Sequence, residues 1–461
     1  MIELLGLCGF EPNEAKSALP RIEKAFNKVG ITATDIERGK ERLNKYYDIE
    51  LEGLRKIFKL NMLEMVDMIL AREEGKKEVV FGFMAPAFET IGTVLNSNSN
   101  EVLAAHHSSA FHTIMGCVFA KIVPILEAAE RKWLKAGKVT HCANTKTILG
   151  LIDLDFIPHP DLLITSGFLC ETAPKTIEYL REMYNIPSCY IDTCQDRNNA
   201  RHLEDTKRTI QLAAESWKKL VDRVQKTVGF EITDKMLQES IEARGKLAEA
   251  VRSVKDVMEN ADPLPAKSTI DTQLMGLMSM SMDLTSRFPE AINAMNTLHD
   301  ELQERVDKGI GVVEKGAPRI LGILPGHHTD PRFDYMVNEM GLAMIATDAD
   351  FGVAYNEPMN DPYTCLSLSL TKSLLLSLPT RIQMIVDLCR KLNIDGILDR
   401  YHVGCRTVTG DAMIIAEAAG TELGIPSMLL EWENFDPRAY SQEQFSRRLK
   451  VFKTMLTKKA G

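Results

Sequence analysis

The feature that most constrains the fold of this chain is a pattern that occurs twice. Each copy runs from an apolar stretch through a loop with a cysteine into a helical pattern, and then through Ile-Pro-Ser into a second apolar stretch. A strand–helix–strand unit forms a parallel sheet, so the repeat predicts two related α/β domains. The copies are DLLITSGFLCETAPKTIEYLREMYNIPSCYI, residues 161–191, and DGILDRYHVGCRTVTGDAMIIAEAAGTELGIPSMLL, residues 395–430.

The whole chain divides into four parts. We expect an α/β fold class with two doubly wound parallel-sheet domains that face a central cleft, together with helices at the start and in the middle. The expected parts are an N-terminal helical segment over 1–75, a first α/β domain over 76–198, a helical connector over 199–315 and a second α/β domain over 316–461.

Individual elements follow from the spacing of apolar residues. In the first part we expect two helices, over 15–29 and 35–72. The patterns between residues 199 and 315 are helical, without a convincing strand. We expect strands at 77–84, 161–165, 187–191, 319–324, 343–347, 396–399 and 427–431.

Composition and charge exclude several classes of protein. The formal net charge is −9 over 461 residues, which argues against a nucleic-acid partner because such proteins normally present a basic face. No stretch reaches the ~18 uninterrupted apolar residues of a membrane-spanning helix. The first residues contain no basic region and no small-residue cleavage site, which a secretory signal would have. We therefore expect a cytoplasmic protein without a membrane partner.

Three of the nine cysteines occupy positions where chemistry is expected. The number of cysteines is odd and the sequence contains no C-x-x-C pair, so neither a disulfide framework nor a zinc ribbon fits. Cys142, Cys170 and Cys405 each lie where a loop meets a helical pattern, and a helix N-terminus favours a thiolate. Three thiolates from separate loops suit a [4Fe–4S] cluster with one open iron, although zinc with a water would accept them too.

The segments around these cysteines resemble the 2-hydroxyacyl-CoA dehydratase / benzoyl-CoA reductase family. The similar segments are THCANTKTILG, the two repeat copies, the extension of the second copy through EWENFDPRAYSQEQFSRRLKVFKTML, and RILGILPGHHTDPRFDYMVNEMGLAMIATD. The resemblance covers roughly residues 78–196 and 318–456. In the family each block supplies one cysteine to a [4Fe–4S] cluster, which by motif match implies Cys142, Cys170 and Cys405 here.

The resemblance implies an activity and partners. It implies an acyl-CoA substrate, a related second subunit in a heterodimer or larger assembly, and a separate ATP-hydrolysing iron–sulfur activator that delivers one electron. In the dehydratases that electron makes a ketyl radical that expels the hydroxyl group, and in the benzoyl-CoA reductases electrons enter an aromatic ring. A non-catalytic electron-transfer subunit, an enlarged double-cubane cluster and a zinc protein without redox chemistry remain alternatives.

Further side chains are candidates for this site. We expect His327 and His328, on the loop after the strand at 319–324, to touch substrate or to move a proton. His402, three residues before Cys405, is expected to donate to a cluster sulfur or to the thioester. Cys117 and Cys194 are possible extra ligands. The adjacent histidines at 106–107 have no carboxylate at useful spacing in the sequence, so we expect them to be structural.

Overall fold

A computed structural model describes most of the chain. The described residues are 1–85, 87–135, 142–167, 171–191, 203–324, 326–348, 361–371, 378–403 and 405–457. Cys170 and Cys194, two of the residues singled out above, lie outside these ranges.

The first sheet has four parallel strands in the order β2-β1-β3-β4. Strand β1 is central, because Phe81 pairs with Ala105 of β2 on one side and with Leu163 of β3 on the other. The strands are β1 (Glu78–Phe83), β2 (Val102–His106), β3 (Leu162–Ser166) and β4 (Ser188–Ile191), and the helical elements among them are α5 (Phe88–Asn98), α6 (Ser109–Phe111), a π-helix (His112–Val118), α7 (Val123–Lys135), α8 (Ala143–Asp153) and α9 (Thr172–Tyr184).

The second sheet repeats this topology, with four parallel strands in the order β6-β5-β7-β8. Leu321 of β5 pairs with Ile397 of β7, as Phe81 pairs with Leu163 in the first sheet. The elements are β5 (Arg319–Ile323), α14 (Arg332–Glu339), β6 (Ala343–Thr347), α15 (Pro362–Thr371), α16 (Leu378–Leu392), β7 (Gly396–Asp399), α17 (Arg406–Ala418), a π-helix (Ala419–Leu423), β8 (Ser427–Leu429), a 3-10 turn (Pro437–Ala439) and α18 (Gln442–Thr457). The predicted fold class of two doubly wound parallel-sheet domains is confirmed.

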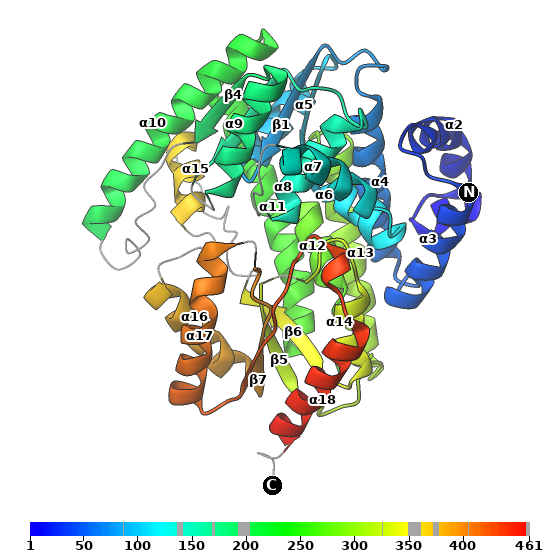
Figure 1. Cartoon of the computed structure of the whole chain (residues 1–461), viewed down its shortest axis with the longest axis vertical. Coiled ribbons are helices and arrows are strands. Elements are labelled where there is room, and N and C mark those ends of the chain that lie inside the picture. Colours follow the sequence, from blue (N-terminus) through cyan, green and yellow to red (C-terminus); the bar gives the residue numbers. More distant parts are fainter. Residues whose placement is uncertain are drawn as a thin grey trace.

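Both faces of each sheet are covered, which explains why the strands are nearly continuous apolar runs. One face of each sheet contributes to a single large core that also includes the helices between them, with Phe81 and Ile345 as members. The opposite face of the first sheet packs around Trp217 of α10, and that of the second around Phe452 of α18. Figure 1 shows the first sheet in the upper half of the molecule and the second in the lower half.

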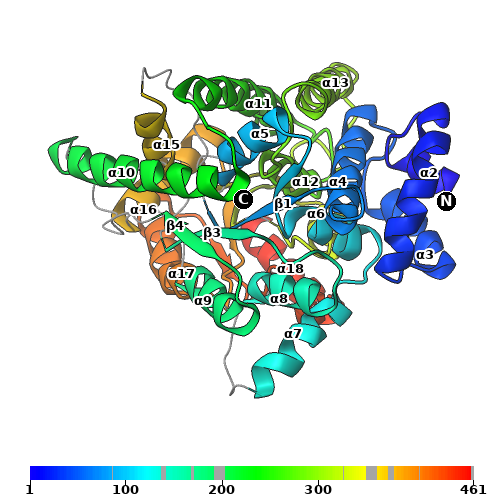
Figure 2. The ribbon, with the colours of Figure 1, turned by 90° about the horizontal axis from the view of Figure 1, so that it is seen from above.

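Helices join the two sheets. The connector consists of α10 (Leu203–Val228), α11 (Asp234–Asn260), α12 (Ile270–Met278) and α13 (Arg287–Asp307). Helix α11 packs on α5 beside the first sheet and on β6 of the second, so it spans both sheet regions. Within the described residues between 203 and 315 every regular element is a helix, as expected. Helix α15 follows β6 in the chain, yet it packs against α10 and α11 (Figure 2).

The N-terminal helices are α1 (Ile2–Leu7), α2 (Pro12–Lys28), α3 (Ala33–Tyr46) and α4 (Glu52–Leu70). The expectation of one helix over 35–72 was wrong, because the chain turns between α3 and α4. Tyr47 adopts an extended conformation there and is buried. The carboxylate of Asp48 accepts the Lys267 amide at 2.7 Å, so a contact distant in sequence stabilises the break. Helix α4 packs along α13, where Gly53 allows close approach to Leu298.

Candidate functional site

The carboxyl ends of β1 and β5 share an unusual backbone conformation. Met84 and Leu324 are the residues that follow these two equivalent strands, and their φ angles are 47° and 64°. Non-glycine residues adopt positive φ at an energetic cost, so the conformation persists only where neighbouring groups hold it. The amide of Leu324 donates to Asp348 Oδ1 at 2.7 Å, and its carbonyl accepts from Arg400 Nη2 at 2.5 Å. Both sheets are therefore strained at the edge where doubly wound folds bind ligands.

Two of the predicted cluster cysteines begin helices at these edges. Cys142 is the N-cap of α8 and Cys405 is the N-cap of α17, and both are half-buried. The amide of Cys405 donates to the carbonyl oxygen of His402 at 2.9 Å, which forms a tight turn between the two residues. The positive end of each helix dipole lies beside its cysteine and favours a thiolate there.

Cys117 lies in a different environment. It is fully buried on the π-helix, and its Sγ donates to the carbonyl oxygen of His328 at 3.2 Å. Burial raises the pKa of its thiol to about 12, so this cysteine holds its proton at neutral pH. A buried, protonated thiol is a poor metal ligand, because ligation requires the thiolate. Burial likewise raises the pKa of Cys8 and of Cys389 to about 12.

The three predicted histidines gather around two aromatic side chains of the loop after β8. The ring of His328 stacks on Phe435 with centroids 4.7 Å apart, and His402 meets the same ring edge-on at 6.0 Å. His327 contacts Trp432 at 5.1 Å. Burial lowers the pKa of His327 and of His402 to about 4, and that of His328 to about 3. All three imidazoles are therefore neutral at physiological pH.

A fourth histidine, which the sequence did not indicate, joins this group from the first domain. His112 is buried, contacts Phe435 at 5.0 Å, and its Nε2 lies 3.1 Å from Thr147 Oγ1 on α8. It begins a π-helix, and π-helical turns occur frequently at functional sites. Its partners come from distant segments, so no local pattern identified it.

Glu433 lies on the loop after β8. Its carboxylate accepts the backbone amide of Phe435 at 3.2 Å. Its Oε1 also lies 3.6 Å from His402 Nδ1. Burial raises the pKa of Glu433 to about 7. The Phe435 amide and Lys146 oppose this shift, and Asp436 adds to it. Sequence reasoning missed this residue as well.

Two buried ion pairs lie near the carboxyl end of β7 in the second sheet. Arg400, fully buried, pairs with Asp334 at 2.6 Å, and Arg381 pairs with Asp348 at 2.6 Å. Asp399 ends β7 beside these pairs, and neither of its carboxyl oxygens has a hydrogen-bond partner among the described residues. Burial raises the pKa of Asp399 to about 7, with Asp348 adding to the shift.

At the first edge, a carboxylate lies beside the histidine pair. His106 Nε2 is 3.4 Å from Glu89 Oε2, so the expectation that the pair at 106–107 lacks a carboxylate was wrong. Glu89 lies in the first turn of α5, far enough along the chain that the spacing did not reveal it. His107 is buried, and its Nδ1 lies 3.1 Å from the carbonyl oxygen of Gly82 in β1, which fits a structural role.

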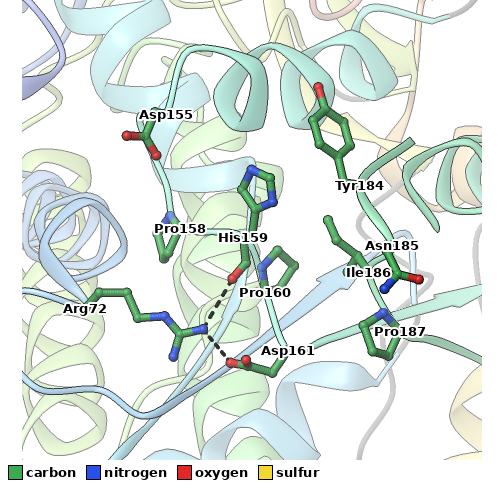
Figure 3. Close-up of a pocket in the computed structure, with 10 residues that line it drawn as sticks. All are labelled: Arg72, Asp155, Pro158, His159, Pro160, Asp161, Tyr184, Asn185, Ile186 and Pro187. Atoms are coloured by element: carbon green, nitrogen blue, oxygen red, sulfur yellow. Dashed lines mark hydrogen bonds and ion pairs between the residues drawn. The ribbon is translucent and has the colours of Figure 1, made fainter. Parts of the chain in front are cut away.

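An open pocket of about 590 Å³ lies at the opposite edge of the first sheet, by the amino ends of β3 and β4 (Figure 3). Arg72 points into it but donates to Asp161 Oδ2 at 2.6 Å and to the carbonyl oxygen of His159 at 3.3 Å. The Arg72 guanidinium is therefore already hydrogen-bonded within the protein. The pocket also lies at the opposite edge of the sheet from the candidate residues.

The described residues show neither a ready metal site nor a membrane span. They contain no group of three histidine, cysteine or acidic side chains placed to hold a metal ion. Because Cys170 lies outside them, the three-cysteine assignment stays a prediction. In the same described ranges, no helix combines the length and the apolar character needed to cross a membrane.

Comparison with known protein families places this chain among acyl-CoA dehydratase components. Residues 111–456 match the family model of the D-component of 2-hydroxyglutaryl-CoA dehydratase, and the chain belongs to this family. The match runs through the helical connector, which the segments of sequence resemblance had left out.

Two curated relatives agree with this assignment. The chain is 21% identical over 321 residues to the alpha subunit of lactoyl-CoA dehydratase from Anaerotignum propionicum, covering 65% of this chain and 70% of that protein. It is also 21% identical over 323 residues to a subunit of benzoyl-CoA reductase from Thauera aromatica, covering 66% of this chain and 72% of that protein. The two relatives carry different activities at equal identity.

Proposed function

We propose that this chain is the [4Fe–4S]-containing subunit of an enzyme of the 2-hydroxyacyl-CoA dehydratase type. In this proposal Cys142, Cys170 and Cys405 supply one thiolate each. The reaction is a radical elimination of water from a CoA thioester after ATP-driven one-electron activation. When bound, the cluster supplies an electron and a Lewis-acidic iron for the thioester carbonyl.

The observation that carries this proposal is the contrast among the cysteines. Cys142 and Cys405 are half-buried at helix N-termini, whereas Cys8, Cys117 and Cys389 are buried with a raised thiol pKa. Thiolate ligands need the former environment, so the residues present fit an iron–sulfur cluster.

The neighbouring histidines would serve the substrate. His327 Nε2 and His402 Nε2 are buried and have no hydrogen-bond partner among the described residues. A neutral imidazole can donate or accept one proton at such an atom, depending on its tautomer. We propose that these nitrogens bind the thioester or the departing hydroxyl group, with His328 held in place by Phe435.

The proposal includes partners. Both relatives are themselves subunits of larger enzymes, which supports a related second subunit for this chain in a heterodimer or larger assembly. An ATP-hydrolysing iron–sulfur activator would deliver the electron, and the substrate would be an acyl-CoA. The cytoplasm suits these thiolate ligands, because it keeps cysteines reduced.

A second candidate function is aromatic ring reduction, which the likeness to the benzoyl-CoA reductase relative favours equally. A non-catalytic electron-transfer subunit with a double-cubane cluster would require further cysteine ligands. Among those named from the sequence, Cys117 is buried and protonated, and Cys194 lies outside the described residues. Metal analysis would distinguish a zinc protein from these iron–sulfur alternatives.

Iron content tests the cluster assignment. Anaerobically purified protein should be brown and should contain about four irons and about four sulfides per chain. Cys405→Ser should lose most of this iron, because it removes a ligand, while Cys389→Ser should keep it. Iron and sulfide quantitation with EPR measures both variants. Equal iron in the two variants, or a colourless wild type that contains zinc, contradicts the proposal.

Substrate assays separate the two activities. With the partner subunit and the activator present, a 2-hydroxyacyl-CoA should be dehydrated and benzoyl-CoA should remain unreduced. The measurement is product formation under ATP-dependent, anaerobic conditions, with activator omitted as the control. Turnover of benzoyl-CoA alone would assign the chain to the reductases.

A further inference from the structure

Arg42 of helix α3 is the residue through which the N-terminal helices reach the loop of His327 and His328. Its Nε donates to the carbonyl oxygen of Cys117 on the π-helix at 2.8 Å, and its Nη2 lies 3.5 Å from Asp330 Oδ1. The side chain of Arg42 is 12% exposed and that of Asp330 is 2% exposed, so water screens this contact only weakly. One guanidinium therefore contacts both sheet domains.

The loop after β5 lies directly on the π-helix that begins with His112. The thiol of Cys117 donates to the carbonyl oxygen of His328 at 3.2 Å. A Cβ added to Gly116 would come within 2.7 Å of Thr329 Cα, so only glycine permits this close approach. The π-helix and the loop are therefore in direct backbone contact at the place where Arg42 binds both.

Asp330 connects the Arg42 contact with the histidines. Its amide donates to the carbonyl oxygen of His327 at 3.3 Å, and its Oδ2 accepts from Arg332 Nε at 2.8 Å. Burial would raise the pKa of this carboxyl group, but the Arg332 hydrogen bond and the charges of Arg332 and Arg42 hold the pKa below its ordinary value. A buried carboxylate that stays ionised requires such partners, so removal of Arg42 would leave its charge less well compensated.

Helix α3 is anchored on the second domain one turn beyond Arg42. The Arg42 guanidinium lies over the ring of Tyr46, 5.3 Å from its centroid, and that ring meets Tyr335 of α14 edge-on at 5.2 Å. These contacts fix where the α3 backbone lies, so the guanidinium is held between its two partners. The family match begins at residue 111, so Arg42 reaches this region from outside the matched part of the chain.

A second ion-pair network between the domains lies nearer the surface. Arg438 lies 2.6 Å from Glu130 Oε1 on α7, and Lys146 on α8 lies 2.9 Å from the same oxygen. The Arg438 side chain is 38% exposed, and ion pairs that water reaches contribute little free energy. Arg42 is shielded more completely, so its contact should restrain the neighbouring loop more strongly.

We propose that Arg42 is a positioning residue that holds the loop of His327 and His328 against the π-helix that begins with His112. The inference rests on the proposed function, because that proposal assigns these histidines to the substrate. Arg42 acts through the carboxylate and the carbonyl oxygen described above. Its removal would therefore free the loop without changing an imidazole or a cysteine.

Histidine labelling in the full-length, cluster-free chain tests this role. Diethyl pyrocarbonate modifies neutral imidazole nitrogens that it can reach, and peptide mass spectrometry measures the rate at His327 and His328 together. Arg42→Ala should raise this rate about tenfold, because a buried, charged hydrogen bond no longer holds the loop. Arg42→Lys keeps the charge without the planar fork and should raise the rate about threefold, which tests the inference if the alanine variant does not fold.

Arg38 provides the matched control, because it lies one turn earlier on the same helix. Its Nη1 donates to the carbonyl oxygen of Phe119, the residue after the π-helix, at 3.2 Å. Arg38→Ala should leave the labelling rate of the loop unchanged. The partly exposed His299 on α13 should react equally in all variants and serves as the internal standard. Wild-type labelling of the loop in Arg42→Ala, or equal acceleration in Arg38→Ala, overturns the inference.

The assembled enzyme separates this inference from the proposed function. Arg42→Ala should keep the iron content of the wild type and lower turnover about tenfold, since the cysteines are unchanged and the histidines are less well placed. Accelerated labelling with wild-type turnover would overturn the inference, because the loop would then be free without consequence for the substrate. A wild type without iron would reject the proposed function, while the labelling rates would still judge Arg42. A thermal unfolding midpoint near that of the wild type shows that each variant is folded.

Discussion

Asp399 ends β7 with two carboxyl oxygens that are buried and without a partner among the described residues. Its pKa is raised to about 7, chiefly by burial and also by Asp348 and Asp411, while Arg381 and Arg400 oppose the shift. The folded chain therefore binds this proton more tightly than the unfolded chain does. Between about pH 4 and pH 7 the unfolded state ionises first, so this group lowers stability as the pH rises.

Asp399→Asn should remove that penalty, because the amide cannot ionise. At pH 8 we expect its free energy of unfolding to exceed that of the wild type by roughly 2–4 kcal/mol, with the difference vanishing below about pH 4. Urea denaturation at both pH values measures it. Asp387→Asn, on the exposed face of α16, is the control and should show no pH-dependent difference. A constant difference across pH would contradict the raised pKa.

Single residues were predictable from the sequence only where local position identified them. Cys142 and Cys405 were placed correctly at loop-to-helix junctions, and His327, His328 and His402 lie on the loops expected of them. Glu433, His112 and Asp399 were missed because their environment comes from other segments. His112, for example, meets Phe435 only after both sheets have formed.

At the scale of elements, the packing of α8 on α7 sets where the Cys142 helix lies. A Cβ on Gly150 would come within 1.9 Å of the carbonyl oxygen of Ile125, so only glycine permits this contact. Gly410 of α17 faces open space instead, with no atom within 4 Å of an added Cβ. The two glycines occupy similar helical backbones and differ only in their surroundings.

Alanine substitutions at these glycines should have opposite effects. Gly150→Ala should lower the free energy of unfolding by about 1–3 kcal/mol, because α7 and α8 must separate. Gly410→Ala should raise it by about 0.5–1 kcal/mol, since alanine stabilises an open helical position. Chemical denaturation of both variants checks the signs. Stabilisation by Gly150→Ala would show that α8 does not pack as closely as described.

Most elements followed from apolar spacing, and the exceptions have physical reasons. The seven expected strands are present, with small differences at their ends. Strand β2 was not singled out, because its sequence VLAAH is short and rich in alanine. The break between α3 and α4 was missed because Asp48 and Lys267, which stabilise it, are far apart in sequence.

At the scale of the whole molecule, the internal repeat was the most informative pattern. It predicted two related domains, and the two sheets have the same strand order. The repeat did not predict that the N-terminal helices, the connector and one face of each sheet share a continuous core. Such long-range packing depends on side chains that no local period describes.

The ion pair between Arg438 and Glu130 also bears on how the chain matures. Helices α7 and α8 emerge from the ribosome long before Arg438, so Glu130 can pair with Lys146 first and gains Arg438 only after the second sheet has been synthesised. This tie between the two halves of the chain is therefore completed only after β8 has been translated.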